Sequence, residues 1–165
     1  MPSLARLSVV AVVFVLVIPA ASLRSQQTAE SDSIYVVAKY DEARDPAADL
    51  QSAVARARTE RKRILMVVGG DWCIDCLRMD LFMRQTSAVA AALRAGFLVL
   101  KVNFSHGNRN EAFLAAYPEI EWYPHVFVLE SDGSLLHSQD TRALHGQRTS
   151  YSEERFLEFL RQWTP

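Results

Sequence analysis

From residue 34 onward, apolar positions follow two alternating patterns. Residues 64–68 and 97–103 are mostly apolar runs with the length of buried strands, and the segments beside them carry apolar residues at helical spacing. Helices on either side of the second run predict that the two strands lie parallel and are joined by a right-handed crossover. The pattern therefore predicts an α/β fold.

The helix before the first strand has a recognisable start. Asp45 followed by Pro46 matches an N-cap with proline at the first helical position. The helix is expected to continue to about Arg61. Its apolar face is formed by Leu50, Val54 and Ala57.

A second helical segment follows the first strand. It is expected to begin near Cys73, with Leu77, Leu81 and Met83 at helical spacing. Polar residues 85–87 interrupt the pattern, so a separate helical piece is expected to follow and to end at Gly96.

The last third of the chain predicts a short helix, a hairpin and a terminal helix. Asn108 is the expected cap of a helix that carries Phe113, Leu114 and Tyr117. Apolar residues 126–129 and 135–137 flank Asp132-Gly133, a strong hairpin signal. Ser150 and Glu153 match a capping box for a final helix, whose inward positions are Phe156, Leu157, Leu160 and Trp163.

The first 33 residues are different in kind. Arg6 precedes an apolar stretch over 7–18, and small residues follow to Ser22, as in a secretory signal peptide. We therefore expect a signal peptide at 1–22, a flexible linker at 23–33 and one domain at 34–165. The stretch is short for a membrane span, which needs about 20 apolar residues, so a cleaved signal is favoured over an uncleaved membrane anchor. The mature protein is expected in the periplasm or otherwise exported.

Composition narrows the possible functions. The chain has 165 residues, half of them hydrophobic, which suits one modest domain. A net charge of −1 does not provide the strong field that nucleic acid or an anionic membrane would need. The basic run at 56–63 is expected to be a solvated helix end. We expect a monomer that binds no nucleic acid.

The only two cysteines, Cys73 and Cys76, are placed for redox chemistry directly after the first strand. At a helix N-terminus, unpaired N–H groups and the helix dipole favour the thiolate of Cys73, which is the expected nucleophile. Cys76 lies almost one turn later and is the expected resolving thiol. Alternatives are a structural disulfide, although a short loop gains little from closure, and a zinc site. Zinc would need two further ligands from His106, His125, His137 and His145.

The order of elements, together with Trp72-Cys73-Ile74-Asp75-Cys76, resembles exported bacterial proteins of the thioredoxin superfamily over residues 34–165. The resemblance implies a thioredoxin fold, with three α/β/α layers around a central mixed sheet. It also implies a cis bond at Tyr123-Pro124, which would form a substrate edge beside Cys73. Trp72 matches the aromatic residue that contacts substrate in the family.

Three positions depart from thioredoxin itself. Val67 stands where thioredoxins have a buried acid that helps to deprotonate the resolving thiol, and the Gly-Pro dipeptide between the cysteines is absent. Asp75 is a candidate proton relay to Cys76, or a solvated acid at the helix start. The charges of Asp75 and Asp71 would raise the thiol pKa values and favour a reducing pair.

These observations predict an exported thiol:disulfide oxidoreductase without a cofactor, more a reductant than an oxidase. Its expected partners are a disulfide-containing protein substrate and a membrane or soluble thiol electron donor, because an oxidising compartment requires a source of electrons. The alternative is a binding module, such as a holdase, an adaptor or a copper or zinc carrier. In that case the cysteines would be ligands, with His125 as a possible third, or vestiges.

Overall fold

The computed structural model describes residues 34–147 and 150–165. The predicted signal peptide at 1–22 and the linker at 23–33 lie outside the described residues. The described residues belong to one compact unit, which begins at Ser33.

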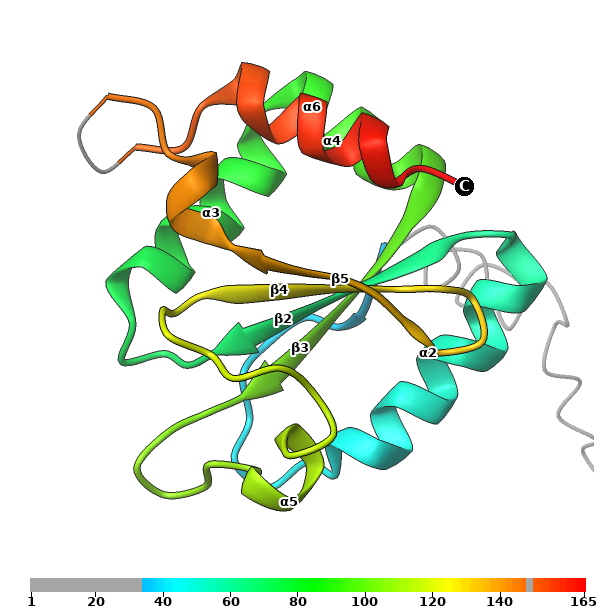
Figure 1. Ribbon diagram of the computed structural model, residues 1–165, viewed down its shortest axis with the longest axis vertical. Coiled ribbons are helices and arrows are strands. Elements are labelled where there is room, and N and C mark those ends of the chain that lie inside the picture. The colour runs from blue at the N-terminus through cyan, green and yellow to red at the C-terminus, as the bar shows by residue number, and fades with distance from the viewer. Residues whose placement is uncertain (1–33, 148–149) are drawn as a thin grey trace, which may run out of the picture. The chain divides into compact units, whose positions relative to one another are not determined.

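A five-stranded mixed sheet forms the middle layer, in the order β1-β3-β2-β4-β5. Both β1 and β2 run parallel to β3, whereas β4 is antiparallel to β2 and β5 to β4 (Figure 1). The parallel pairing of the two apolar runs confirms the prediction. The strands are β1 Tyr35–Val37, β2 Arg63–Gly69, β3 Phe97–Asn103, β4 His125–Leu129 and β5 Leu135–Asp140.

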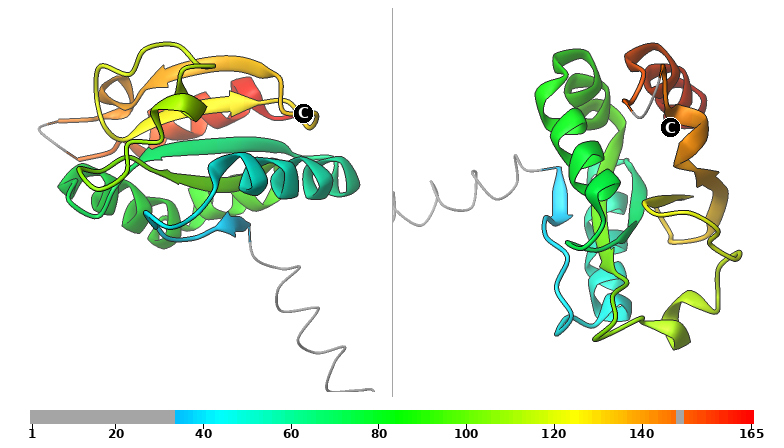
Figure 2. Two further views of the ribbon diagram at one scale, coloured as in Figure 1. Left: turned by 90° about the horizontal axis from the view of Figure 1, so that it is seen from below. Right: turned by 90° about the vertical axis from the view of Figure 1, so that its left-hand side faces the viewer.

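Helices cover both faces of this sheet, so the fold is the predicted three-layer α/β/α arrangement. Helices α3, α4 and α6 lie on one face, and α2 and α5 lie on the other (Figures 1 and 2). A short 3-10 helix, η1, follows β5. The helices are α2 Pro46–Glu60, α3 Ile74–Gln85, α4 Ser87–Gly96, α5 Glu111–Leu114, η1 Thr141–Leu144 and α6 Glu153–Trp163.

Two hydrophobic cores follow from the alternation of side chains along the strands. Leu65 and Val67 of β2 face α3, α4 and α6, where they pack in a cluster that includes Met79 and Phe156. Ile64, Met66 and Val68 of the same strand face the α2 side. Because β2 is covered on both faces, it is apolar along almost its whole length.

Helix α3 buries only Met83 of the three apolar residues whose spacing predicted it. Leu77 is 41% exposed and Leu81 is 53% exposed, whereas Cys76, Met79 and Met83 are buried. The prediction of the helix was correct, but helical spacing alone did not identify which of two apolar stripes faces the sheet.

Two predicted helix caps are also shifted along the chain. Helix α5 is capped by Asn110 in a left-handed conformation rather than by Asn108, and it is only four residues long, so Tyr117 lies beyond it. Helix α6 begins after Ser152 rather than Ser150, because the Ser152 hydroxyl accepts the hydrogen bond from Arg155 N–H.

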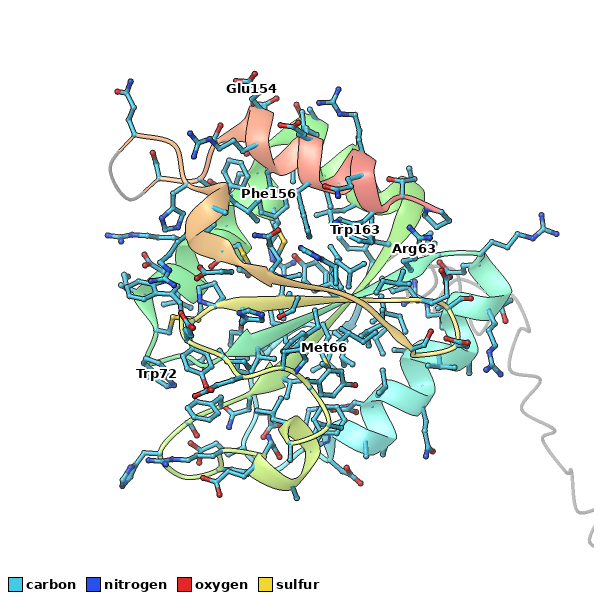
Figure 3. The ribbon with its side chains drawn as sticks, viewed as in Figure 1. Arg63, Met66, Trp72, Glu154, Phe156 and Trp163 are labelled. Atoms are coloured by element: carbon cyan, nitrogen blue, oxygen red, sulfur yellow. A yellow bond between two sulfur atoms is a disulfide. The ribbon has the colours of Figure 1, made fainter. Side chains whose placement is uncertain are left out.

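The two ends of β2 have different roles. At its first residue, the Arg63 guanidinium donates hydrogen bonds to the carbonyl oxygens of Trp163 and Thr164, which fixes the C-terminal end of the chain. Trp72, which follows the other end, lies on the opposite side of the molecule (Figure 3). The cysteines therefore lie at the carboxyl end of β2, away from the chain's C-terminus.

Candidate active site

The cysteine pair lies where β2 gives way to α3. Gly70 O accepts a hydrogen bond from Cys73 N–H at 3.0 Å, and this turn brings Cys73 to the N-cap position of α3. Cys73 and Cys76 are joined by a disulfide, with Cα atoms 5.2 Å apart. The sequence pattern predicted the helix start near Cys73.

The two sulfur atoms have different surroundings. Cys73 Sγ accepts a hydrogen bond from Cys76 N–H at 3.1 Å, and it belongs to the more exposed residue of the pair, at 6% against 1% for Cys76. An amide directed at Cys73 Sγ, together with the helix dipole, stabilises negative charge there once the disulfide opens. Cys73 is therefore the better placed nucleophile.

A hollow of about 370 Å³ opens beside Cys73. The Tyr123–Pro124 peptide bond, which is cis in the structure, follows directly from the lining residue Tyr123. The hollow brings Trp72 and Tyr123, two of the predicted substrate-binding residues, together with the nucleophile. Its lining comprises Trp72, Cys73, Ile74, Asp75, Glu121, Trp122 and Tyr123.

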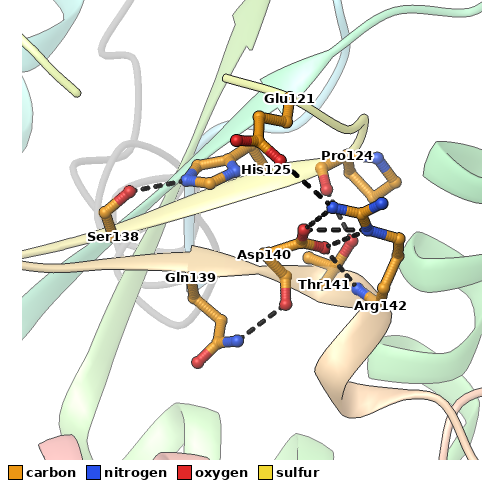
Figure 4. A network of polar contacts seen from close by, with 8 residues as sticks. All are labelled: Glu121, Pro124, His125, Ser138, Gln139, Asp140, Thr141 and Arg142. Carbon is orange, nitrogen blue, oxygen red and sulfur yellow. Dashed lines mark hydrogen bonds and ion pairs between the residues drawn. The ribbon is translucent and has the colours of Figure 1, made fainter. Parts of the chain in front are cut away.

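The loop that ends at Pro124 is held by the segment after β5 (Figure 4). The buried Thr141 hydroxyl donates to Pro124 O at 2.5 Å. Arg142 pairs with Asp140 and lies 3.5 Å from a Glu121 carboxylate oxygen. These contacts fix the loop against η1, which the sequence did not predict.

Trp72 is held in place although it is 59% exposed. Its indole Nε1 donates to Phe104 O at 2.7 Å, and its ring meets Tyr123 edge to face with centroids 5.8 Å apart. Phe104 in turn stacks on Tyr123 at 4.6 Å. Phe104 is therefore a member of the site that sequence reasoning missed, because nothing distinguishes it from a residue that ends a strand.

Asp75 lies between the cysteines, but its carboxylate is engaged with a cation. Asp75 Oδ1 accepts a hydrogen bond from Arg78 at 2.9 Å, one turn along α3. The positive charge of Arg78 offsets the negative charge of Asp75 near the cysteines.

An ion pair between the buried Lys101 and the partly buried Asp80 lies next to Val67. Lys101 on β3 is the register partner of Val67 on β2. Lys101 Nζ lies 2.8 Å from Asp80 Oδ1 of α3. Burial works against ionisation of Asp80, but hydrogen bonds from Lys101 and Arg84 outweigh it and lower the pKa of the carboxyl. A lysine inside the apolar run 97–103 was the signal in the sequence, but its partner was not evident.

His125 is not brought to the thiols as a third ligand. Its Nε2 lies 2.8 Å from the Ser138 hydroxyl, and its ring packs against Phe127 with centroids 4.7 Å apart. Burial lowers the pKa of this imidazole. Within residues 34–147 and 150–165, no three His, Cys, Asp or Glu side chains are grouped to hold a metal ion.

Within the described part of the chain, no helix combines the length and the apolar character that crossing a bilayer requires.

Sequence comparison identifies one family. Residues 45–131 match the family described as thioredoxin-like. This span is more than half of the chain and includes β2, both cysteines, β3 and the cis Tyr123–Pro124 bond. No curated protein sequence matches the chain.

Solved structures show the same likeness. The chain is 28% identical to a disulphide isomerase from Xylella fastidiosa Temecula1, with a TM-score of 0.64 over 74% of this chain and 94% of that one. It is 26% identical to the reduced DsbD C-terminal domain of Neisseria meningitidis, with a TM-score of 0.52 over 72% and 96%. The oxidised form of that domain gives 23% identity and a TM-score of 0.53 over the same shares.

Proposed function

This chain belongs to the thioredoxin-like family, and from that membership we propose that it is an exported thiol:disulfide oxidoreductase that reduces protein disulfides. The observation that carries the proposal is the position of Cys73. It is the N-cap of α3, its sulfur accepts the Cys76 N–H, and it lines a hollow next to Tyr123-Pro124. Two solved relatives above 25% identity are named as a disulphide isomerase and as a DsbD C-terminal domain.

The reaction proceeds by two thiol–disulfide exchanges. The Cys73 thiolate attacks one sulfur of the substrate disulfide, so a Cys73–substrate bond forms and the other substrate sulfur leaves as a thiolate. The Cys76 thiolate then attacks Cys73 Sγ, which forms the Cys73–Cys76 disulfide and releases the second substrate sulfur. The substrate gains two electrons and takes two protons from water, and the dithiol is oxidised.

The hollow supplies the docking site for an extended substrate segment. The backbone before Pro124 would pair with the substrate strand, which places its disulfide against Cys73. Trp72 and Tyr123 would contact the side chains beside the disulfide, together with the exposed Ile74 and Trp122. The fixed loop limits the entropy lost when the substrate binds.

The proposed direction is reduction. Asp71 and Asp75 place carboxylates before and within the motif, and their charge disfavours the thiolates, which makes the dithiol more easily oxidised. Because Arg78 offsets the charge of Asp75, Asp71 is the main source of the negative charge that disfavours the thiolates. The reduction potential, measured against glutathione, tests it: a potential in the range of strong oxidants, about −120 mV, would reverse the assigned direction.

Export and an electron donor complete the proposal. The apolar stretch at 7–18 with small residues to Ser22 supports secretion, after which the dithiol must be reduced again by a membrane or soluble thiol donor. N-terminal sequencing of the protein from cell extract and from the exported fraction tests the cleavage. A mature N-terminus after residues 20–22 is expected, whereas an intact Met1 in the exported fraction would indicate an anchor.

The activity is tested by reduction of protein disulfides with the wild type and the Cys73→Ser and Cys76→Ser variants. Wild type is expected to be active and both variants inactive, and only Cys76→Ser is expected to accumulate a mixed disulfide through Cys73. Equal inactivity of wild type and Cys73→Ser against several disulfide proteins would contradict the enzyme assignment. The trapped partner also identifies the substrate by mass spectrometry.

A further inference from the structure

Tyr40 lies against the buried sulfur of the pair, on the segment between β1 and α2. It packs in one cluster with Cys73 and Cys76. A Cβ placed on Gly69 would lie 2.5 Å from Cys76 Sγ and 3.0 Å from the Tyr40 hydroxyl oxygen. Both atoms therefore lie beside the same point of the glycine, which makes the Tyr40 hydroxyl a neighbour of the Cys76 sulfur.

The Tyr40 hydroxyl is buried and, among residues 34–147 and 150–165, has no hydrogen-bond partner while the disulfide is closed. A buried polar group in that state carries a desolvation cost, which is recovered when it gains a partner. Opening of the disulfide creates one, because the Cys76 sulfur changes from a disulfide sulfur into a thiol or thiolate. A thiolate is the stronger acceptor, since hydrogen bonds to charged groups exceed those to neutral ones.

We propose that Tyr40 is a catalytic residue of the resolving step, whose hydroxyl donates a hydrogen bond to the Cys76 thiolate. This inference rests on the redox role proposed for the cysteine pair. It adds Tyr40 to the residues that take part in that reaction. Val67 packs in the apolar core, at the position where thioredoxins have the acid that assists the resolving thiol. In this chain the Tyr40 hydroxyl assists Cys76 instead. It stabilises the attacking thiolate but does not take its proton, which passes to water.

Tyr40 keeps its own proton at any pH at which the protein works. Burial, followed by the charge of Asp80, raises the pKa of this phenol far above its usual value. Lys101 Nζ lies 5.1 Å from the centre of the Tyr40 ring and opposes the Asp80 charge. The titratable and charged groups around the phenol are Asp80, Lys101, Asp71, Tyr35 and Tyr151. A group held in its protonated form acts as a donor and not as a base.

A protein with one thiol isolates the effect without any substrate. In Cys73→Ser the only remaining sulfur nucleophile is Cys76, and its pKa is read from the ultraviolet absorbance of the thiolate against pH. Adding Tyr40→Phe removes one hydroxyl. The expected result is a rise of the Cys76 pKa by about one unit, a tenfold smaller thiolate fraction at a given pH below it.

Tyr117→Phe in the same Cys73→Ser background is the control. Tyr117 is partly buried, but its ring packs against Phe113 and Phe127 in the core on the α2 side of the sheet. The Cys76 pKa is expected to be unchanged by this substitution. An equal pKa with and without the Tyr40 hydroxyl would overturn the proposal, as would an equal rise caused by Tyr117→Phe.

The kinetic counterpart uses the protein with both cysteines. Tyr40→Phe is expected to slow the decay of a Cys73 mixed disulfide about threefold at neutral pH, because the smaller thiolate fraction is partly offset by the greater nucleophilicity of the more basic thiolate, while alkylation of Cys73 keeps its wild-type rate. Equal slowing of both steps would indicate a general disturbance of the site and contradict the assignment. Because the thiolate titration needs no reductase activity, it can fail or succeed independently of the proposed function.

Discussion

At the scale of single residues, Gly69 at the end of β2 leaves no room for a side chain beside the disulfide. A methyl group there would meet Cys76 Sγ at 2.5 Å and the Tyr40 hydroxyl at 3.0 Å. Neither neighbour can withdraw, because Cys76 is in a helix and bonded to Cys73, and Tyr40 is enclosed. We predict that Gly69→Ala lowers the free energy of unfolding by about 1 to 3 kcal/mol, as overpacking does.

Denaturant unfolding of the oxidised protein measures this loss. Gly146→Ala is the control, since its Cβ would come no closer than 3.4 Å to any neighbour, an ordinary contact. Unfolding curves of Gly69→Ala and wild type that coincide would show that the site has more room than the structure describes.

The ion pair of Asp80 and Lys101 predicts a dependence of stability on pH. Because the pKa of Asp80 is lower in the folded state, its stabilising effect is complete above the unfolded pKa of about 4 and is lost as pH falls through the folded value. Asp80→Asn leaves Lys101 buried without its partner, so we predict a loss of about 3 kcal/mol near neutral pH. The difference in the free energy of unfolding between Asp80→Asn and wild type should become smaller in acid.

Urea unfolding at neutral pH and below about pH 4 checks both parts of this prediction. Arg84→Gln is the matched control, because it removes the more exposed partner of the same carboxylate and should cost less than about 1 kcal/mol. A constant difference between Asp80→Asn and wild type across this range would contradict the assigned role of Asp80.

The residues of the site differ in how far the sequence revealed them. Cys73 and Cys76 were identified because their type, spacing and position after a strand are informative on their own, whereas Tyr123-Pro124 was identified through the resemblance to the thioredoxin superfamily. Tyr40, Phe104 and Thr141 were not, because they reach the site through contacts with segments far away in the chain. Such contacts depend on how the layers pack, and no local pattern records them.

At the scale of elements, long periodic segments were predictable and short ones were not. Helix α2, strands β2 and β3 and the hairpin around Gly133 agree with the patterns that predicted them. Strand β1 and helix η1 contain three and four residues, too few to show a period, and they form because β3 and β5 lie beside them. The buried face of α3 was missed for a related reason, since the neighbouring layers decide which stripe is covered.

The start of α6 offers a direct test between two serines. Ser152 is the N-cap, with its side chain accepting from Arg155 N–H, whereas the Ser150 hydroxyl donates to Gln147 O outside the helix. We predict that Ser152→Ala lowers the free energy of unfolding by about 1 kcal/mol and that Ser150→Ala costs less. Thermal or urea unfolding of the two variants compares them, and a larger loss for Ser150→Ala would favour the capping box predicted from the sequence.

At the scale of the whole molecule, we predict that residues 34–165 form the folding unit. Internal contacts divide the chain at Ser33, and both hydrophobic cores are built from residues after it. A protein that begins at Ile34 is expected to unfold in one cooperative transition within a few degrees of the full chain. Calorimetry of the two proteins measures this, and a broad or absent transition in the shorter protein would contradict the boundary.

The three tryptophans are arranged so that their fluorescence should report whether the Cys73–Cys76 disulfide is open or closed. Trp72 and Trp122 line the hollow beside Cys73, whereas Trp163, at the end of α6, stacks on His137 of β5. A disulfide quenches the emission of a nearby indole, so opening the Cys73–Cys76 bond should brighten two of the three fluorophores and leave the third unchanged. Electron transfer can therefore be followed in real time in the unlabelled protein, and Trp163 serves as the internal reference.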